Sequence, residues 1–294
     1  LRNHIAVLAS DSFGGRHPTG RGGELTVDYI RDAFQRIGLR PGSRDGTYTQ
    51  RVPLIQYTAT SHLIHTTTEN ELRLRSPEDL FAWSVDLRQI PAQPVSLDDR
   101  ELVFAGYGID APEFEWDDYG EADVRGKVVL VLPGDPPPSN DKGRSGGELK
   151  RFDPDAPSRH ASAGAKVTEA AKRGAAALIL IVEPEFNGLS YEVYAQSLAR
   201  ERLVLPPAER HVSEAEAATE ALGSGRGILM SRSAARALFT HAGAEYDRLV
   251  GDAASRSFTA VPLAGRSTIR VEAEAHASSS DNVLGLLEGS DPLL

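Results

Sequence analysis

The residues of this chain with the widest chemical repertoire are its eight histidines. None of them belongs to an H-E-x-x-H motif, and none is followed two residues later by Asp, so no zinc-ligand pair of familiar spacing is present. His62 and His65 lie three residues apart in a Thr-rich stretch that we expect to be extended. Side chains alternate between the two faces of a strand. We therefore expect these two histidines to point apart and to be exposed polar residues. The others are His4, His17, His160, His211, His241 and His276.

A pair of carboxylates, Asp117 and Asp118, follows Trp116 and precedes Tyr119. Such a pair could belong to a calcium site, but a hard cation needs several more oxygen ligands at loop spacing. We expect a hydrogen-bonded turn that is anchored by the two aromatic residues.

The glycine and serine motifs do not supply chemistry of their own. Gly126-Lys127 lacks the upstream glycine and the following hydroxyl of a phosphate loop, and a strand follows it. The run from Gly20 to Gly23 opens a helix and could bind an anion, but a turn for close backbone packing is favoured. No G-x-S-x-G motif occurs, and the absence of cysteine excludes thiolate chemistry. The residues by themselves therefore predict no catalytic and no metal-binding side chain.

The elements around these residues follow from periodicity. Ile30, Ala33, Phe34 and Ile37 form the apolar face of a helix that ends at Gly38. Ala163, Val167, Ala170 and Ala171 predict a second helix over 162–173, and Ser233 can cap a third that ends at Gly243. We expect strands at 48–54, 102–108, 127–132, 175–182 and 227–230, the third and fourth buried on both faces.

The remaining stretches are less regular. Residues 55–97 are weakly patterned and predict only short strands, and residues 134–160 predict the longest loop. Apolar residues alternate with polar ones over 269–275, as in a half-solvated strand. The nearly continuous apolar residues of 283–287 predict a further strand that is covered on both faces in the full-length protein and is partly bare in this chain.

Composition narrows the class of protein. The 294 residues suffice for one large or two ordinary domains. The net charge of −10 argues against binding to nucleic acid or to an anionic membrane surface. No apolar run approaches the roughly 20 residues of a membrane span. No signal peptide is visible. The chain starts at Leu1 and stops at Leu294 directly after an apolar strand, so we expect a piece of a longer protein.

Three groups of residues resemble, in order, segments of the M28 family of zinc peptidases, in the subgroup with an inserted protease-associated (PA) domain. The first group is Leu8–Arg16 (LASDSFGGR), Thr19-Gly20 and the following helix. The second is Val103–Ile109 (VFAGYGI), Asp117–Tyr119, Gly126–Val129 and Lys172–Ala177 (KRGAAA). The third is Asn282–Gly285 (NVLG) with Gly289–Pro292 (GSDP).

The resemblance implies an α/β fold: the incomplete N-terminal part of a zinc-peptidase domain, interrupted by a PA-type α/β domain. Its expected parts are the start of the peptidase domain at 1–97, the PA-like insert at 98–262 and the return into the peptidase sheet at 263–294. In the family an H-x-D pair that binds zinc follows the "GSDP" turn, and this chain ends before it. No zinc ligand or catalytic residue can therefore be carried over to a position of this sequence.

For the parent protein the resemblance implies a zinc-dependent aminopeptidase. Two zinc ions would activate a water molecule, a carboxylate would move its proton, and the substrate would be a peptide with a free N-terminus. The PA insert would shape the cleft and restrict access. The chain by itself is expected to bind no zinc and to be inactive, and the family suggests a secreted or periplasmic protein.

The alternative is a PA-type protein-interaction module without enzymatic activity. The reading frame after Leu294 discriminates between the two: an H-x-D within about 20 residues indicates the enzyme, and a stop codon indicates the module. We favour the enzyme, because a free-standing module has no need for residues 1–54 or 268–294.

Overall fold

The computed structural model describes residues 1–83, 85, 87–137, 152–153, 156–207 and 226–289, which form a mixed α/β fold with a large sheet. The chain divides into two units. Unit 1 contains the described residues of 1–57, 203–207 and 275–289, and unit 2 contains those of 58–202 and 226–274. Two strands, β2 (Thr49–Thr66) and β14 (Val261–Val283), contribute residues to both units.

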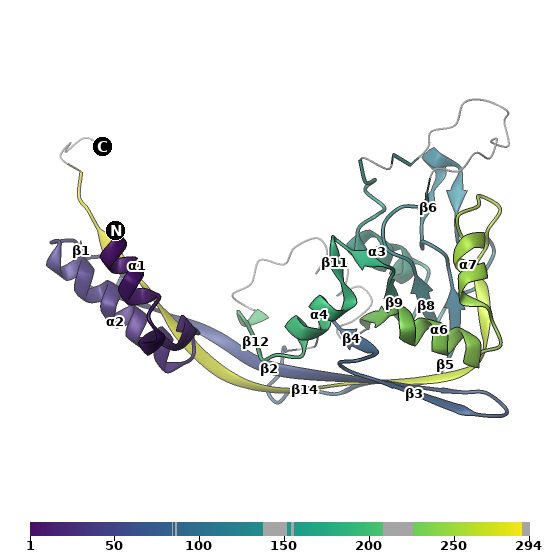
Figure 1. Ribbon diagram of the computed structural model, residues 1–294, viewed down its shortest axis with the longest axis horizontal. Coiled ribbons are helices and arrows are strands. Elements are labelled where there is room, and N and C mark those ends of the chain that lie inside the picture. The colour runs from purple at the N-terminus through teal and green to yellow at the C-terminus, as the bar shows by residue number, and fades with distance from the viewer. Residues whose placement is uncertain (84, 86, 138–151, 154–155, 208–225, 290–294) are drawn as a thin grey trace. The chain divides into compact units, whose positions relative to one another are not determined.

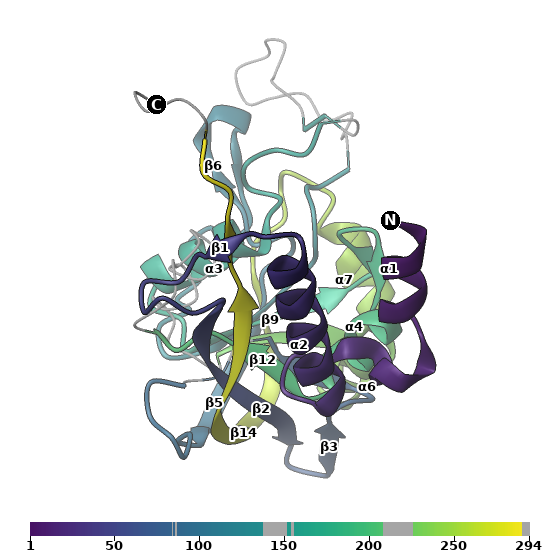
Figure 2. The ribbon, with the colours of Figure 1, turned by 90° about the vertical axis from the view of Figure 1, so that its left-hand side faces the viewer.

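In unit 1 a short 3-10 helix packs closely against a long α-helix. α1 (Arg2–Leu8) continues through η1 (Asp11–Arg16) into α2 (Arg21–Arg36), as Figure 2 shows. A Cβ atom on Gly22 would lie 1.8 Å from the carbonyl oxygen of Phe13, and one on Gly23 would lie 2.5 Å from that of His17. Only glycine permits this approach of the two backbones. The prediction of a backbone-packing turn at residues 20–23 is thus confirmed.

The early and late parts of the sequence meet within unit 1. β1 (Arg40–Pro41) pairs antiparallel with β15 (Gly285–Leu286). The amide of Gly42 donates to the carbonyl of Leu284 at 3.1 Å, and the amide of Leu284 donates to the carbonyl of Tyr48 at 2.8 Å. These contacts place residues 40–48 beside residues 284–286.

The centre of unit 2 is a set of four parallel strands with antiparallel neighbours (Figure 1). β5, β8, β9 and β13 are parallel, β4 pairs antiparallel with β13, and β14 pairs antiparallel with β5. Every residue of β8, β9 and β13 is buried, as expected for strands with helices on both faces. Their bounds are β4 (Leu80–Ala82), β5 (Val95–Phe104), β8 (Val128–Val131), β9 (Ala177–Val182) and β13 (Gly227–Ser231).

Successive side chains of these strands enter two separate cores, one on each face of the sheet. Leu130, Ile179 and Met230 belong to the core that α6 and α7 cover, whereas Val129 and Leu180 belong to the core that α3 and α4 cover. The helices are α3 (Ala163–Lys172), α4 (Tyr191–Leu198), α6 (Arg232–His241) and α7 (Tyr246–Asp252). The smaller elements are β3 (Glu71–Arg75), β6 (Asp110–Ala111), η2 (Pro112–Phe114), β7 (Trp116–Asp117), β10 (Glu185–Phe186), β11 (Leu189–Ser190) and β12 (Arg202–Val204).

The prediction of only short strands in residues 55–97 is wrong. β2 has 18 residues, and it alternates buried and partly exposed positions from Ile55 to His65. This alternation is visible in the sequence, but small and polar residues such as Ala59 and Ser61 occupy some inward positions. The strand predicted over 269–275 is longer than predicted, because it is part of β14, which runs from Val261 to Val283. The separate strand predicted over 283–287 is the two-residue β15. Part of the apolar surface over 283–287 was expected to be bare in this chain, and Leu286 and Leu287 are 48% and 81% exposed.

Two details of the helices differ from the predictions. Ile37 was expected on the buried face of α2, but it follows the last helical residue and is 70% exposed. Ser231, not Ser233, caps α6: its hydroxyl accepts a hydrogen bond from the amide of Ala234 at 3.1 Å. The glycine positions after the helices are confirmed, because Gly38 and Gly243 both adopt left-handed backbone conformations. The loop predicted over 134–160 lies largely outside the described residues.

Candidate functional site

The histidines do not assemble into a metal centre in the part of the chain that the structure describes. Within those residues, no three His, Cys, Asp or Glu side chains lie close enough together to hold a metal ion. His211 lies outside the described residues. His4 contacts the hydroxyl of Tyr29, and His17 contacts that of Thr19, so both engage single polar neighbours.

His62 and His65 lie on opposite faces of β2, as predicted, but His65 is not exposed. It is fully buried, whereas His62 is partly exposed. The Nε2 atom of His65 lies 2.9 Å from the carbonyl oxygen of Ala264, and its Nδ1 atom lies 2.8 Å from Oγ of Ser267. The prediction failed because pairing with a distant strand decides which face of β2 is covered, and that pairing is not readable from residues 62–65.

The contact between Ser267 and His65 has the distance of a nucleophile and its general base. Both residues are at most 1% exposed, however. A substrate carbonyl would have to reach Ser267 Oγ through the packed sheet, so this pair is structural in the folded chain.

Another histidine, His160, joins a surface ion-pair cluster. Its Nε2 atom lies 3.0 Å from Oε1 of Glu113, and Arg159 donates to the same oxygen at 2.8 Å. The hydrogen bond with His160, more than any other contact, lowers the pKa of Glu113 to about 2. A carboxylate held by two donors in this way is a poor proton acceptor at neutral pH.

The carboxylates of Asp117 and Asp118 form the hydrogen-bonded turn that the sequence predicts. Asp118 is buried and accepts from the amide of Ile109 at 3.0 Å and from Nε1 of Trp116 at 2.8 Å. Asp117 accepts from the amide of Tyr119 at 3.0 Å. These contacts leave Asp118 bound to protein donors and oriented away from solvent.

The most unusual polar group of unit 2 is Lys166 on α3, which is 1% exposed. Its Nζ atom donates to the carbonyl of Tyr107 at 2.5 Å and to that of Gly134 at 2.8 Å. Burial lowers the pKa of Lys166 and raises that of Asp118, and the attraction between the two charges opposes both shifts. Sequence analysis missed this lysine because its neighbours in the helical stripe read as an ordinary amphipathic pattern.

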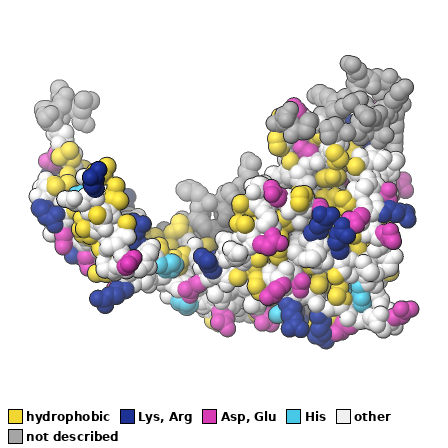
Figure 3. All heavy atoms as spheres, in the orientation of Figure 1, with side chains coloured by type: hydrophobic (Ala, Val, Ile, Leu, Met, Phe, Trp, Pro, Cys, Tyr) yellow, Lys and Arg dark blue, Asp and Glu magenta, His cyan; other side chains and the backbone are white. Residues whose placement is uncertain are grey.

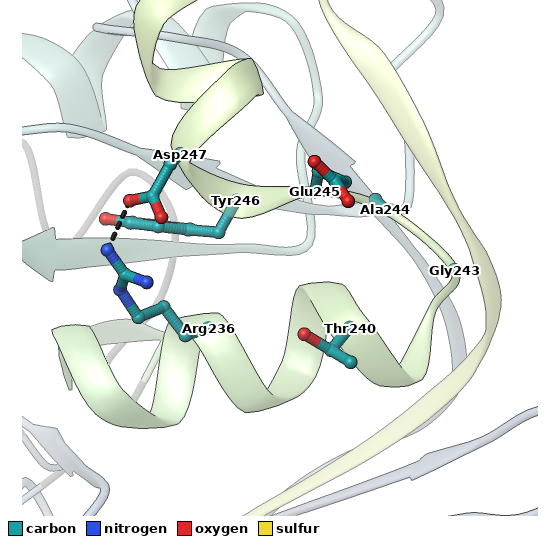
Figure 4. A pocket seen from close by; sticks show the side chains of 7 residues that line it. All are labelled: Arg236, Thr240, Gly243, Ala244, Glu245, Tyr246 and Asp247. Atoms are coloured by element: carbon teal, nitrogen blue, oxygen red, sulfur yellow. Dashed lines mark hydrogen bonds and ion pairs between the residues drawn. The ribbon is translucent and has the colours of Figure 1, made fainter.

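A hollow of about 390 Å³ lies between α6 and α7, and Figure 4 shows the side chains that line it. Arg236 of α6 and Asp247 of α7 form an ion pair across it, and the Arg236 guanidinium lies over the ring of Tyr246. The Tyr246 hydroxyl donates to Glu183 at 2.7 Å, and burial raises its pKa. The polar groups at one end of the hollow thus already bind one another, and a ligand there would have to replace an ion pair.

Two further hollows lie one in each unit. In unit 1 a hollow of about 470 Å³ is bordered by charged side chains of both signs, among them Glu24, Asp28, Arg51 and Asp281. In unit 2 a hollow of about 570 Å³ lies beside the irregular part of β14 and is lined by Thr66, Asp99 and Arg266. The lining of the unit 1 hollow contains no nucleophile beside a base. The lining of the unit 2 hollow includes Ser267, but its hydroxyl contacts the fully buried His65 and is itself buried.

No family model matches the sequence, and no curated protein matches it. Among solved structures, the chain is similar to an aminopeptidase from Aneurinibacillus sp. strain AM-1, with a TM-score of 0.42 and 18% sequence identity. The match covers 99% of this chain and 48% of that protein, so the chain spans about half of its length. Among the described helices, none combines the length and the apolar character that a bilayer span requires.

Proposed function

We propose that the chain is part of a zinc-dependent aminopeptidase of the M28 type that carries an inserted PA-type domain. The observation that carries this proposal is the meeting of two distant segments in unit 1. The first motif group ends with α2, which β1 follows directly, and the third group begins at Asn282 and includes the start of β15. β1 and β15 pair with each other in unit 1. An inserted domain leaves the two halves of its host adjacent. The motif order and this pairing thus support one interrupted domain.

The residues of the second motif group build the sheet of unit 2 and the turn beside it. Val103 pairs with Val129 in the parallel sheet, and the carbonyl of Gly174 accepts from the amide of Gly126 at 2.8 Å. The proposed PA-type domain comprises residues 98–262, with the peptidase portions at 1–97 and 263–294. In this proposal it shapes access to a cleft and does no chemistry itself.

The described residues do not fit a zinc centre, because zinc needs three or four protein ligands in fixed geometry and no group of three candidate ligands is present among them. We therefore assign no step of peptide hydrolysis to a residue of this chain. In the proposal the two zinc ions, the general base and the site for the peptide N-terminus belong to polypeptide that follows Leu294 in a secreted or periplasmic parent protein.

The test begins with the coding sequence after Leu294. We expect an H-x-D within about 20 residues, which is one strand and a connection. The extended protein should hydrolyse an aminoacyl chromogenic substrate, lose activity with a chelator and regain it with Zn²⁺. The 294-residue chain should show no turnover with or without Zn²⁺. Metal-dependent turnover by the shorter chain would place a catalytic site within it and contradict the proposal.

A non-enzymatic interaction module is the second candidate. It is favoured by the self-contained packing of unit 2, whose two apolar cores lie on the faces of its own sheet. A stop codon directly after Leu294 would support this candidate and remove the peptidase proposal.

A further inference from the structure

The strongest unexplained feature of unit 2 is the cluster around His65, which we call the His65 junction. It consists of His65 on β2, His241 at the end of α6, and Ala264, Gly265 and Ser267 on β14. The register between β14 and β5 shifts on both sides of Ser267, so β14 bulges at this point. Three elements that are far apart in the sequence therefore meet on one imidazole ring.

The bulge has the shape that the imidazole ring requires. Gly265 adopts a left-handed backbone conformation with φ of +105°, and a Cβ atom there would lie 2.7 Å from both Cε1 and Nε2 of His65. Any other residue would be strained by its backbone conformation and would also collide with the ring. The close fit indicates that the bulge is shaped to hold the His65 ring in one position.

The hydrogen bonds determine the protonation state of His65. The carbonyl of Ala264 can only accept, so Nε2 carries the hydrogen atom, and Nδ1 of the neutral ring then accepts from the Ser267 hydroxyl. A second proton on Nδ1 would leave two hydrogen atoms between Nδ1 and Oγ. The Ser267 hydroxyl would have to turn away and find another acceptor inside the sheet.

No negatively charged side chain among the described residues contacts His65, so a protonated ring would lack a compensating charge. The ring of His241 meets the ring of His65 edge-on with 5.4 Å between centroids, and its Nε2 atom is buried without a hydrogen-bond partner among the described residues. Leu72 of β3 pairs with His65 in the sheet. On β14 the nearest cationic side chain, Arg266, is bound to Asp99 and Glu101. No described carboxylate contacts the imidazole.

We propose that the His65 junction is an acid-sensitive contact: the neutral ring joins β2, β14 and α6, and its protonation loosens the β14 bulge. The bulge is the part of the junction nearest to water, since Ala264 to Ser267 line the hollow of about 570 Å³ in unit 2. When the β14 bulge opens, water reaches the protonated His65 ring, while the parallel strands β8, β9 and β13 stay paired.

The direction of the pH dependence follows from linkage. Burial lowers the pKa of His65 below its ordinary value of 6.5, and the neighbouring His241 lowers it further, while hydrogen bonding to the backbone at Ala264 and Arg266 opposes this without reversing it. The unfolded or opened chain therefore binds a proton in a pH range where the closed chain does not. The stability of the junction is complete above pH 6.5 and is lost as the pH falls from 6.5 toward the lowered pKa.

Hydrogen exchange of the intact chain tests the proposal directly. Exchange rates are measured between pH 7.5 and 5.0 and corrected for the intrinsic rate at each pH. The protection factors of residues 261–268 and 58–66 should fall by up to about tenfold per pH unit below 6.5. Protection of β9 and α3 should stay constant. Equal loss in all these segments, or no loss at the bulge, would overturn the proposal.

Three variants test whether the pH dependence of the bulge comes from His65. His65→Gln keeps a donor and an acceptor but does not titrate, so its bulge should show little pH dependence. The matched control is His62→Gln, on the other face of the same strand, which should behave like the unaltered chain. His241→Gln should weaken the dependence without removing it. Should His65→Gln fail to fold, NMR titration of histidine-labelled unaltered chain decides: a His65 pKa at or above 6.5 would overturn the proposal.

Discussion

At the scale of single residues, the interior of unit 2 contains charged groups that an apolar core does not require. Lys166 spans from α3 to the loops that follow β5 and β8, because the carbonyls of Tyr107 and Gly134 both accept from its ammonium group. Asp118 is equally buried and holds the turn after β7 through Ile109 and Trp116. These two residues therefore determine where the loops at one edge of the sheet lie.

Replacing Lys166 should lower the free energy of unfolding markedly. Lys166→Met keeps most of the volume but leaves the buried carbonyls of Tyr107 and Gly134 without this donor and removes the attraction to Asp118. A buried polar group left unsatisfied typically costs about 1–3 kcal/mol. Urea unfolding measures the loss. The control, Lys172→Met on the same helix, removes an exposed lysine paired with Glu169 at 3.5 Å and should cost less than about 0.5 kcal/mol.

The double variant Lys166→Met/Asp118→Asn separates charge from packing. It removes both buried charges and should recover part of the stability that Lys166→Met loses. If the double variant loses as much stability, relative to the unaltered chain, as Lys166→Met and Asp118→Asn lose together, the two side chains act independently, and the inferred attraction between the buried charges is wrong.

At the scale of elements, caps and glycines set where the helices of this chain start and end. Ser231 follows the last buried apolar residue of β13 and its hydroxyl caps α6, so strand and helix join without a loop. The sequence also offers Ser233 for this role. The earlier serine is used because the strand ends there and its amide donates to the carbonyl of Asp79 at 2.8 Å.

The assignment of this cap can be tested by two substitutions. Ser231→Ala should destabilise the chain by about 1 kcal/mol, because the amide of Ala234 then lacks an acceptor within the protein. Ser233→Ala, two residues later, should have a much smaller effect. Midpoints of urea unfolding at equal slope compare the two, and a larger loss for Ser233→Ala would assign the cap to the later serine.

The junction of η1 and α2 is a second element-scale feature with a clear expectation. Gly22→Ala places a Cβ atom where the Phe13 carbonyl oxygen lies, so the helices of unit 1 must separate. We expect a loss of about 1–3 kcal/mol, as for other overpacked sites. Gly289→Ala, in the same unit but with no atom within 4 Å of the added carbon, should be nearly neutral. Thermal unfolding followed by circular dichroism distinguishes the two outcomes.

At the scale of the whole molecule, the two units differ in how much apolar surface they cover. Unit 2 has a core on each face of its sheet and a smaller buried cluster around Trp116. The only large buried side chains among the described residues of unit 1 are Phe13, Ile55 and Tyr57. Leu1, Ile5, Ile37, Leu286 and Leu287 of unit 1 are between 48% and 95% exposed. Figure 3 shows hydrophobic side chains gathered on the surface over α1 and α2.

This surface should make the isolated chain bind a hydrophobic dye or self-associate, since exposed apolar patches are interaction sites. Ile37→Lys combined with Leu287→Lys should reduce dye fluorescence and shift sedimentation toward the monomer. The control places lysines at Leu189 and Val193 of unit 2, which are 42% and 46% exposed, and should change the signal less. An unaltered chain that is monomeric and silent to the dye would contradict the expectation.

Local patterns in the sequence determined the elements whose partners lie close in the chain. Continuous apolar runs indicated β8 and β9, the stripe from Ala163 to Ala171 indicated α3, and the residues around Asp118 indicated their turn. Each of these depends on a period or a neighbour within a few residues. The helix ends at Gly38 and Gly243 follow for the same reason.

Other features of the fold were decided only by contacts between segments that are distant in the sequence. The lengths of β2 and β14, the burial of His65 and Lys166, and the pairing of Arg40 with Leu286 all depend on segments about 60 to 250 residues away. An inward position on β2 accepts Ala59, Ser61 or His65 because the opposite surface provides the matching volume and hydrogen bonds. The polarity of the residue itself does not reveal that surface, which exists only after the distant strands have paired.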